Sequence, residues 1–177
     1  MATAAPLPIT PDFATAYRDL ALTSFESEVP VTRRVLEAVL DSKHDYRPDP
    51  KARTAWELAC HIAKEDVLFL DQIAEGRFNF PDTRYDAQLP KTSKDLSAWY
   101  EKNTKRAMET LRKVSPAKLV TPVVFLGMFK FPVVLYLDFL IKHSVHHRGQ
   151  LAAYLRPLGS SVPSIYGGSA DEEWKAA

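Results

Sequence analysis

The segment between residues 136 and 154 places apolar side chains and histidines on one helical stripe. Its members, spaced three or four residues apart, are Tyr136, Leu140, His143, His147, Leu151 and Tyr154. This spacing predicts a helix that turns the stripe toward a core. His143 and His147 would lie one turn apart on that helix, close enough to bind one metal ion together. His146 falls on another side of the helix, and we interpret it as peripheral.

A second helix is predicted from Thr54, and it carries a candidate for the third ligand. Thr54 and Glu57 have the spacing of a capping box, in which each side chain bonds the other residue's amide. The following residues that share one helix face are Leu58, His61, Glu65 and Leu68. A single histidine on such a face is more often a hydrogen-bonded core residue than a ligand. If this helix packs beside the histidine pair, however, three imidazoles converge in the interior.

Other residues near these histidines have structural interpretations. Glu65 lies one turn beyond the histidine of this second helix, and we expect it to hydrogen-bond a ligand or to be solvated rather than to bind a metal itself. Cys60 precedes that histidine and points about 100° away from it on a helix, which indicates a small buried apolar residue. We expect Arg148 and Gln150 to make structural contacts or to line the rim of a pocket. Gly149, with the alanines that follow it, is predicted to permit close packing of a neighbouring helix.

Periodicity along the rest of the chain predicts four long helices and no internal linker. The first helix is expected to kink at Pro30. Its expected core residues are Phe13, Leu20, Leu22, Val35, Leu36 and Val39. The expected helices run over about residues 12–39, from Thr54 to about residue 74 with Gly76 as the end, from Thr92 or Ser93 to before Pro116, and from Pro132 to Leu155. This pattern is typical of an all-α four-helix bundle.

Two connections between the predicted helices are unusual. Residues 77–90 are too many for a simple bundle turn. The aromatic residues expected to line the mouth of a pocket there are Phe78, Phe80 and Tyr85. Residues 120–131 are rich in strand formers, which predicts a short β-hairpin around Gly127 before the last helix. Near the end of the chain, Tyr166 is expected to pack rather than to catalyse.

Composition indicates a single domain. With 177 residues and 46% hydrophobic content, the chain can bury one sizeable core, with residues 1–11 and 168–177 expected as flexible tails. The net charge is +1 with both signs interleaved, which argues against nucleic-acid binding. Cys60 is the single cysteine and the chain begins without a long apolar run, so we expect a reducing, cytoplasmic location. The apolar stretch 133–141 contains Asp138, and no segment is apolar for the length of a membrane span.

Several short motifs occur along the chain in a recognisable order. They are Tyr46-Arg47-Pro48, Trp56-Glu57-Leu58 with His61, the run from His143 to Leu151, Tyr154-Leu155-Arg156, and the tail from Val162 to Glu172. With these motifs the chain, from about residue 12 onward, resembles the DinB family of bacterial damage-inducible proteins, which is distinct from the DNA polymerase of that name. The resemblance implies a four-helix bundle in which one histidine of the second helix and two of the fourth hold a divalent metal ion. By that motif the ligands are His61, His143 and His147.

Three imidazoles would leave room for chemistry at the metal. Neutral ligands keep the full charge of a divalent ion and leave a position open for water or substrate, as in catalytic sites. We expect zinc or nickel, with iron, manganese or copper as alternatives, because the ligand set does not select one ion. Some proteins of the family that the chain resembles are thiol S-transferases, which implies transfer of a low-molecular-weight thiol to an electrophile, or a related hydrolytic or detoxification step. No catalytic residue is assigned beyond the metal-bound water or thiolate, with Glu65 beside it.

Two other interpretations stay open. The same histidines could tie two helices together in a non-catalytic metal- or ligand-binding stress protein, or they could form polar core networks without a metal. An open coordination position beneath an accessible cleft would distinguish an enzyme from a binding module. The family resemblance also implies a homodimer, and the small residues of the first helix that would allow close approach of a second copy are Ala14, Ala16 and Ala21.

Overall fold

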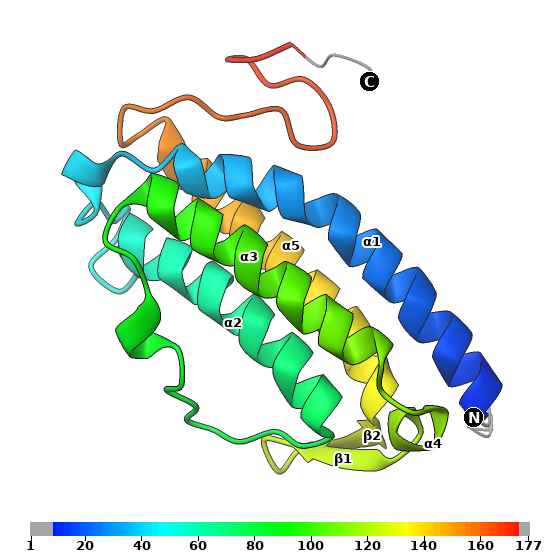
Figure 1. The fold of residues 1–177 in the computed structure, drawn as a ribbon. Helices are drawn as coiled ribbons and strands as arrows, with labels where there is room; N and C mark the ends of the chain where they lie inside the picture. Colours follow the sequence, from blue (N-terminus) through cyan, green and yellow to red (C-terminus); the bar gives the residue numbers. More distant parts are fainter. Residues whose placement is uncertain (1–8, 174–177) are drawn as a thin grey trace, which may run out of the picture.

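The structure is a computed structural model that describes residues 9–173, and four long helices dominate it (Figure 1). These helices are α1 (Pro11–Glu37), α2 (Ala55–Glu75), α3 (Ser93–Arg112) and α5 (Tyr136–Leu155). The shorter elements are the helix α4 (Pro116–Leu119), the strands β1 (Pro122–Phe125) and β2 (Phe129–Pro132), and the 3-10 turns η1 (Asp41–Lys43), η2 (Asp86–Gln88) and η3 (Val133–Leu135). The predicted four-helix bundle with a hairpin before the last helix is confirmed.

Local chemistry explains where α2 begins and ends. The Thr54 hydroxyl accepts a hydrogen bond from the Glu57 amide at 3.1 Å, and the Glu57 carboxylate accepts one from the Thr54 amide at 2.7 Å. The predicted capping box is therefore present, and it satisfies two amides that the helix itself leaves free. At the other end Gly76 adopts φ 72°, the left-handed conformation that suits glycine and closes a helix.

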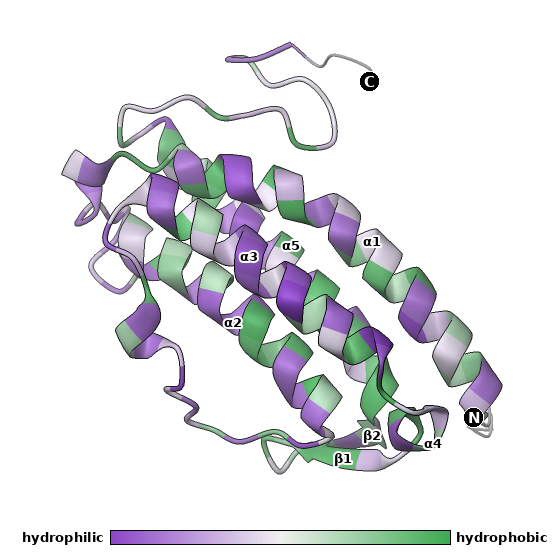
Figure 2. Cartoon of the chain, viewed as in Figure 1, coloured by the Kyte–Doolittle hydropathy of each residue, from purple (hydrophilic) through white to green (hydrophobic). Residues whose placement is uncertain are grey.

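The core lies between the four long helices. Figure 2 shows hydrophobic and polar residues on each of them, as expected for helices with one buried side. Fully buried side chains come from every one of these helices and include Leu22, Phe25, Leu58, Leu70, Leu96, Leu111, Leu140 and Leu151. The helices that carry the candidate ligands, α2 and α5, pack against each other within this arrangement.

The buried side of α1 agrees with the predicted one except near its start. Leu22, Val35, Leu36 and Val39 are buried as expected, whereas Phe13 and Leu20 leave 52% and 69% of their surfaces exposed. Ala14 and Ala21, one position later in each case, are buried instead. Since these two alanines are buried within the chain, they offer no surface to a second copy, and only Ala16 of the proposed set is exposed. The helix itself runs unbroken past Pro30.

The predicted hairpin forms, but α5 begins later than expected. The two strands pair antiparallel with Phe125 opposite Phe129, which leaves a three-residue loop in which Leu126 and Gly127 have φ values of 50° and 69°. Pro132 was predicted as the first residue of the last helix, yet it is the last residue of β2 and pairs with Pro122. A 3-10 turn follows it, and α5 begins only at Tyr136.

The segment after α5 returns across α1 (Figure 1). The Asp171 carboxylate accepts hydrogen bonds from the Arg156 side chain at 2.9 Å and the Val162 amide at 2.8 Å. Glu172 accepts one from the Ser164 amide at 2.8 Å. Part of the segment expected as a flexible tail is thus held by hydrogen bonds, while residues 1–8 and 174–177 of the two expected tails lie outside the described residues. Among the described helices, none combines the length and apolar character needed to cross a membrane.

Candidate metal centre

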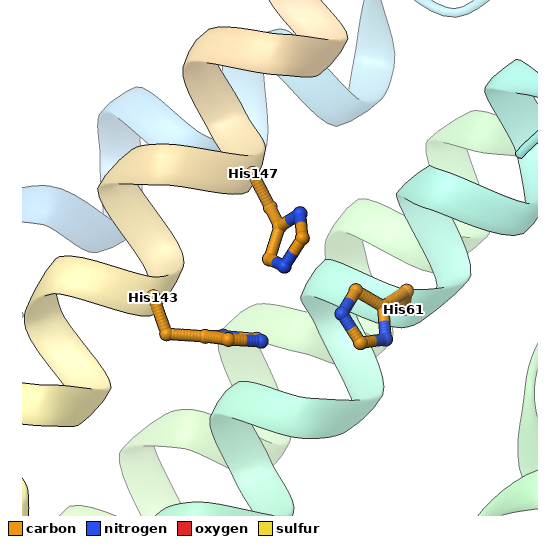
Figure 3. A group of neighbouring side chains, drawn as sticks. All are labelled: His61, His143 and His147. Atoms are coloured by element: carbon orange, nitrogen blue, oxygen red, sulfur yellow. The ribbon is translucent and has the colours of Figure 1, made fainter. Parts of the chain in front are cut away.

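Three imidazoles meet between α2 and α5. His61 comes from α2, and His143 and His147 come from successive turns of α5 (Figure 3). Each offers a ring nitrogen, and these three nitrogens lie within 4.8 Å of one another. Nitrogens that bind one tetrahedral zinc ion at about 2.0–2.1 Å lie roughly 3.4 Å apart, so a small inward movement of the side chains would complete such a geometry. The structure therefore brings together the three residues that the sequence singles out.

Burial keeps these imidazoles neutral. It lowers the pKa of His61 to about 3, with further lowering from the nearby Arg53 guanidinium and the other two rings. Burial and the ring of His147 likewise lower the pKa of His143 to about 4. Neutral imidazole is the form that donates a lone pair to a metal. The low pKa values mean that protons compete weakly for these nitrogens at neutral pH.

One nitrogen of the cluster is buried without a partner. Within residues 9–173, Nδ1 of His143 has no hydrogen-bond partner. An unsatisfied buried polar atom carries an energetic cost that a bound ion or an ordered water would remove. Together with the neutral donor set, this unsatisfied atom fits a site for a cation that accepts nitrogen lone pairs.

Gln150 orients the ring of His147. Its amide oxygen lies 3.1 Å from Nδ1 of His147, so Nδ1 donates the hydrogen and Nε2 keeps its lone pair free. Partners of this kind fix the tautomer and the ring orientation of metal-binding histidines. The sequence suggested only a structural or rim contact for Gln150. A spacing of three residues on one helix was the available signal for this hydrogen bond.

Glu65, His146 and Cys60 lie near the cluster but outside it. The Glu65 carboxylate is 3.9 Å from Nδ1 of His61, beyond hydrogen-bonding distance, and 3.7 Å from the Lys64 ammonium. His146 is exposed, as expected for a peripheral residue. Burial raises the pKa of the Cys60 thiol to about 11, which keeps it protonated at neutral pH. The cluster thus has three protein donors, and other coordination positions of an ion there would be open.

The residues that follow the two α5 histidines anchor this helix in the core. The Ser144 hydroxyl donates to the Asp66 carboxylate of α2 at 2.7 Å, and the Tyr100 hydroxyl of α3 donates to the same oxygen at 2.9 Å. Arg148 is 1% exposed and pairs with the Glu28 carboxylate of α1 at 2.5 Å. These contacts set the rotation of α5 about its axis, so its histidines face His61. The sequence indicated a structural contact for Arg148 but did not identify the Asp66 network.

Two predictions about the surroundings of the site need correction. Gly149 is exposed, and a Cβ atom built on it would meet nothing within 4 Å, so it does not permit a close helix approach. It lies on the solvent side of α5, away from the anchored face.

Tyr85 was expected near the mouth of the site, but its hydroxyl forms hydrogen bonds with Asp71 of α2 and the Arg106 guanidinium of α3. The long connection therefore turns this ring toward α3.

Phe78 and Phe80 lie nearer to the cluster, behind another aromatic ring. The ring centroid of Phe78 is 5.8 Å from that of Phe69, which in turn lies 5.7 Å from the ring of His143. Phe78 and Phe80 both pack against Phe125 of the hairpin, at 5.0 and 5.3 Å. The apolar end of the site is thus closed by rings from α2, the long connection and β1.

Comparison with known proteins agrees with this architecture. The family model described as DinB family matches residues 13–176. The chain belongs to the DinB family. It is 27% identical to the uncharacterized protein YrdA of Bacillus subtilis strain 168 over 157 residues, which are 88% of this chain and 91% of YrdA. It is 24% identical to the uncharacterized protein YjoA of the same strain over 144 residues, which are 80% of this chain and 91% of YjoA.

Solved structures of DinB-like proteins share the fold. The crystal structure of a DinB-like protein from Bacillus cereus ATCC 10987 has a TM-score of 0.67 at 26% identity and covers 82% of this chain and 95% of that one. The crystal structure of YjoA from Bacillus subtilis has a TM-score of 0.64 at 24% identity, and the match covers 82% of this chain and 96% of the YjoA chain. In this DinB protein, the bundle brings one histidine of α2 and two of α5 into a cluster that could hold a metal ion.

Proposed function

We propose that this DinB-family protein binds a divalent ion through His61, His143 and His147 and uses it to transfer a low-molecular-weight thiol to an electrophile. The observation that carries the proposal is the convergence of three neutral, partly exposed imidazoles, with no fourth side chain in the cluster among residues 9–173. Structural zinc sites commonly have four protein ligands, whereas catalytic sites keep a position open. Zinc or nickel is the ion we propose, because both accept imidazole and thiolate donors.

A divalent ion in this cluster would lower the pKa of a thiol that reaches it, so that the thiolate forms at neutral pH. The chain's own residues prepare that step. The neutral imidazoles add no negative charge that would offset the ion, and Gln150 holds His147 in one orientation. Glu65 is the nearby carboxylate, and burial raises its pKa, which makes the carboxylate a stronger base.

In the proposed transfer, the thiol proton passes to the Glu65 carboxylate and from there to solvent. The sulfur lone pair forms a bond to the electrophilic carbon, and the leaving group departs with the electron pair of its own bond. The reaction consumes one thiol and one electrophile and needs no oxidant or reductant.

Metal content tests the binding part of the proposal. Protein purified without a histidine tag should contain about one divalent ion per chain, and His147→Ala should lose it. His146→Ala is the matched control because His146 neighbours the cluster in sequence but is exposed and outside it. Metal analysis by mass spectrometry would show whether the two variants differ. Equal metal loss in both variants would contradict the ligand assignment.

Cobalt substitution tests the thiol part. A thiolate that binds cobalt gives an intense sulfur-to-metal charge-transfer band that water cannot give, and this band should rise as glutathione, bacillithiol or mycothiol is added. The apparent affinity should increase as the pH rises toward about 8.5, since the metal binds the deprotonated thiol. If none of these thiols changes the spectrum of cobalt-loaded protein, thiol transfer is excluded while metal binding stands.

A further inference from the structure

An aromatic cavity is lined by residues of α1, the hairpin, η3 and the start of α5. Figure 1 shows the hairpin at the end of the bundle where α5 begins. The volume of the cavity is about 340 Å³. The side chains that line most of it are Tyr17, Phe125, Phe129, Phe131, Tyr136 and Phe139. Ligand pockets in proteins commonly have volumes of roughly 300–1,000 Å³ and are mostly apolar. This cavity has the size and lining of a pocket for a small apolar group.

The floor of the cavity is rigid, whereas its rim is exposed. Phe125 is buried, and the Tyr136 hydroxyl donates to the Val123 carbonyl at 2.8 Å, which fixes the Tyr136 ring. In contrast, Phe131 and Phe139 leave 47% and 41% of their surfaces in solvent. Exposed aromatic rings around a concave apolar surface gain free energy when a ligand covers them. The floor therefore needs little rearrangement when a ligand enters.

Polar groups at the cavity are few. Asp138 reaches its edge, but its carboxylate accepts a hydrogen bond from the Lys142 ammonium at 2.7 Å. Within the part of the chain that the structure describes, the Tyr17 hydroxyl makes no hydrogen bond. It is thus available to a ligand as donor or acceptor. A neutral flat molecule with one hydrogen-bonding group matches this lining better than an ion does.

One ring connects the cavity with the cluster. Phe139 lines the cavity and precedes His143 by one helical turn, with 6.4 Å between the ring centroids. Phe139 also packs against Phe125 on the cavity floor at 5.3 Å. A group bound against Phe139 would therefore contact a ring that is itself a near neighbour of the His143 ring.

We propose that this cavity binds the neutral aromatic part of the electrophile and holds it next to the metal cluster. The assignment of the bound molecule as the electrophile rests on the proposed function. The binding of a neutral aromatic group does not, because it follows from the lining and the volume alone. The substrates of choice would then be aromatic electrophiles with one hydrogen-bonding group.

Fluorescence titration with N-phenyl-1-naphthylamine tests the binding. This neutral probe should bind the zinc-loaded full chain with enhanced emission, and Phe131→Ala should weaken binding about tenfold because a ring of the wall is lost. Tyr17→Phe should weaken it about threefold through loss of the hydrogen bond to the probe amine. Leu20→Ala is the matched control, since Leu20 is 69% exposed on α1 but does not line the cavity. Circular dichroism would verify that each variant is folded.

Equal affinity in Phe131→Ala and in the unmodified chain would overturn the proposal. A probe affinity that falls as the chain self-associates would also overturn it, because a second copy would then cover the lining of the cavity.

Proximity to the cluster is tested with cobalt, whose unpaired electrons broaden the proton NMR signals of a bound probe. Broadening with cobalt-loaded protein, but not with zinc-loaded protein or with cobalt added to His147→Ala, is expected. Binding without that broadening would exclude a shared site, whatever the outcome of the thiol experiment.

Discussion

Asp66 is a fully buried ionisable group in the neighbourhood of the site. Its carboxyl is fully buried, and both Tyr100 and Ser144 donate to its Oδ2 atom. Within residues 9–173, its Oδ1 atom has no hydrogen-bond partner. Burial raises the pKa of this group to about 7, against the lowering effect of the two hydroxyl donors. Near neutral pH the core therefore contains a carboxyl group that is partly protonated.

This pKa predicts how Asp66→Asn changes stability. The folded pKa of about 7 exceeds the ordinary value of 3.8, so the contribution of Asp66 is most favourable below pH 3.8 and is lost as the pH rises through 7. Asparagine keeps an acceptor oxygen but cannot ionise. We expect the variant to be more stable than the original chain by about 2 kcal/mol at pH 8, and to differ much less at pH 5.

Urea denaturation at the two pH values would measure this difference, because the histidines contribute equally to both proteins and cancel. Asp138→Asn is the control, since its carboxylate is exposed and paired on the surface with Lys142. It should shift stability by less than about 1 kcal/mol at both pH values. An Asp66→Asn chain that is less stable than the original at pH 8 would show that the ionised carboxylate is the favourable form.

The residues of the site differ in how far the sequence reveals them. His143 and His147 could be paired from their spacing alone, and His61 could be added because its helix has an apolar face and a family motif. Asp66 and Ser144 could not be identified in this way. Each is a single polar residue on an apolar face, and only the packing of α2 against α5 shows that one is the other's partner.

At the level of elements, a boundary was predictable where its cause is local. Both ends of α2 follow from side chains and backbone within a few residues, the capping box at Thr54 and the glycine at position 76. The start of α5 could not be predicted, because Pro132 suits the first turn of a helix and the end of a strand equally well. Its pairing with Pro122 across the hairpin decides between them. The exposure of Leu20 on α1 likewise depends on which neighbours the first turns of that helix meet.

Arg148 makes a contact between α5 and α1 that we expect to contribute strongly to the free energy of unfolding. Its guanidinium is buried, pairs with Glu28 of α1, donates to Thr32 at 3.2 Å and lies 5.1 Å from the ring centroid of Tyr166. Arg148→Ala removes the cationic partner of the partly buried Glu28 carboxylate, which keeps only the hydrogen bond from the Tyr166 hydroxyl at 2.8 Å. We therefore expect a loss of about 3 kcal/mol in the free energy of unfolding. Chemical denaturation monitored by circular dichroism would measure it.

Arg112 provides a matched comparison, since it also pairs with an α1 carboxylate, that of Glu26 at 2.7 Å. Both partners of that pair are largely exposed, and ion pairs of this kind contribute about 0–1 kcal/mol. Arg112→Ala should therefore cost far less than Arg148→Ala. Similar losses in the two variants would mean that burial does not set the strength of the α1 to α5 contact.

In the whole molecule, the core and the histidine cluster are largely separate. α1 and α3 carry no residue of the cluster, yet they supply fully buried side chains such as Leu22 and Tyr100. A bundle with its own apolar core does not need an ion to fold, unlike a zinc finger, whose small core cannot hold it together without the metal. The ion would act on stability as a ligand of the folded state.

Removal of the metal should accordingly lower the melting temperature without unfolding the chain. An ion present at about 100 times its dissociation constant stabilises the folded state by roughly 2.7 kcal/mol. For a chain of this size each kcal/mol corresponds to about 2–4 °C, so chelation should lower the melting temperature by roughly 5–10 °C while the helical circular dichroism spectrum persists at 20 °C. His147→Ala should melt at the same temperature with and without added metal, because one of its three donors is missing. A random-coil spectrum of the metal-free chain would show that the imidazole cluster, and not the apolar core, holds α2 and α5 together.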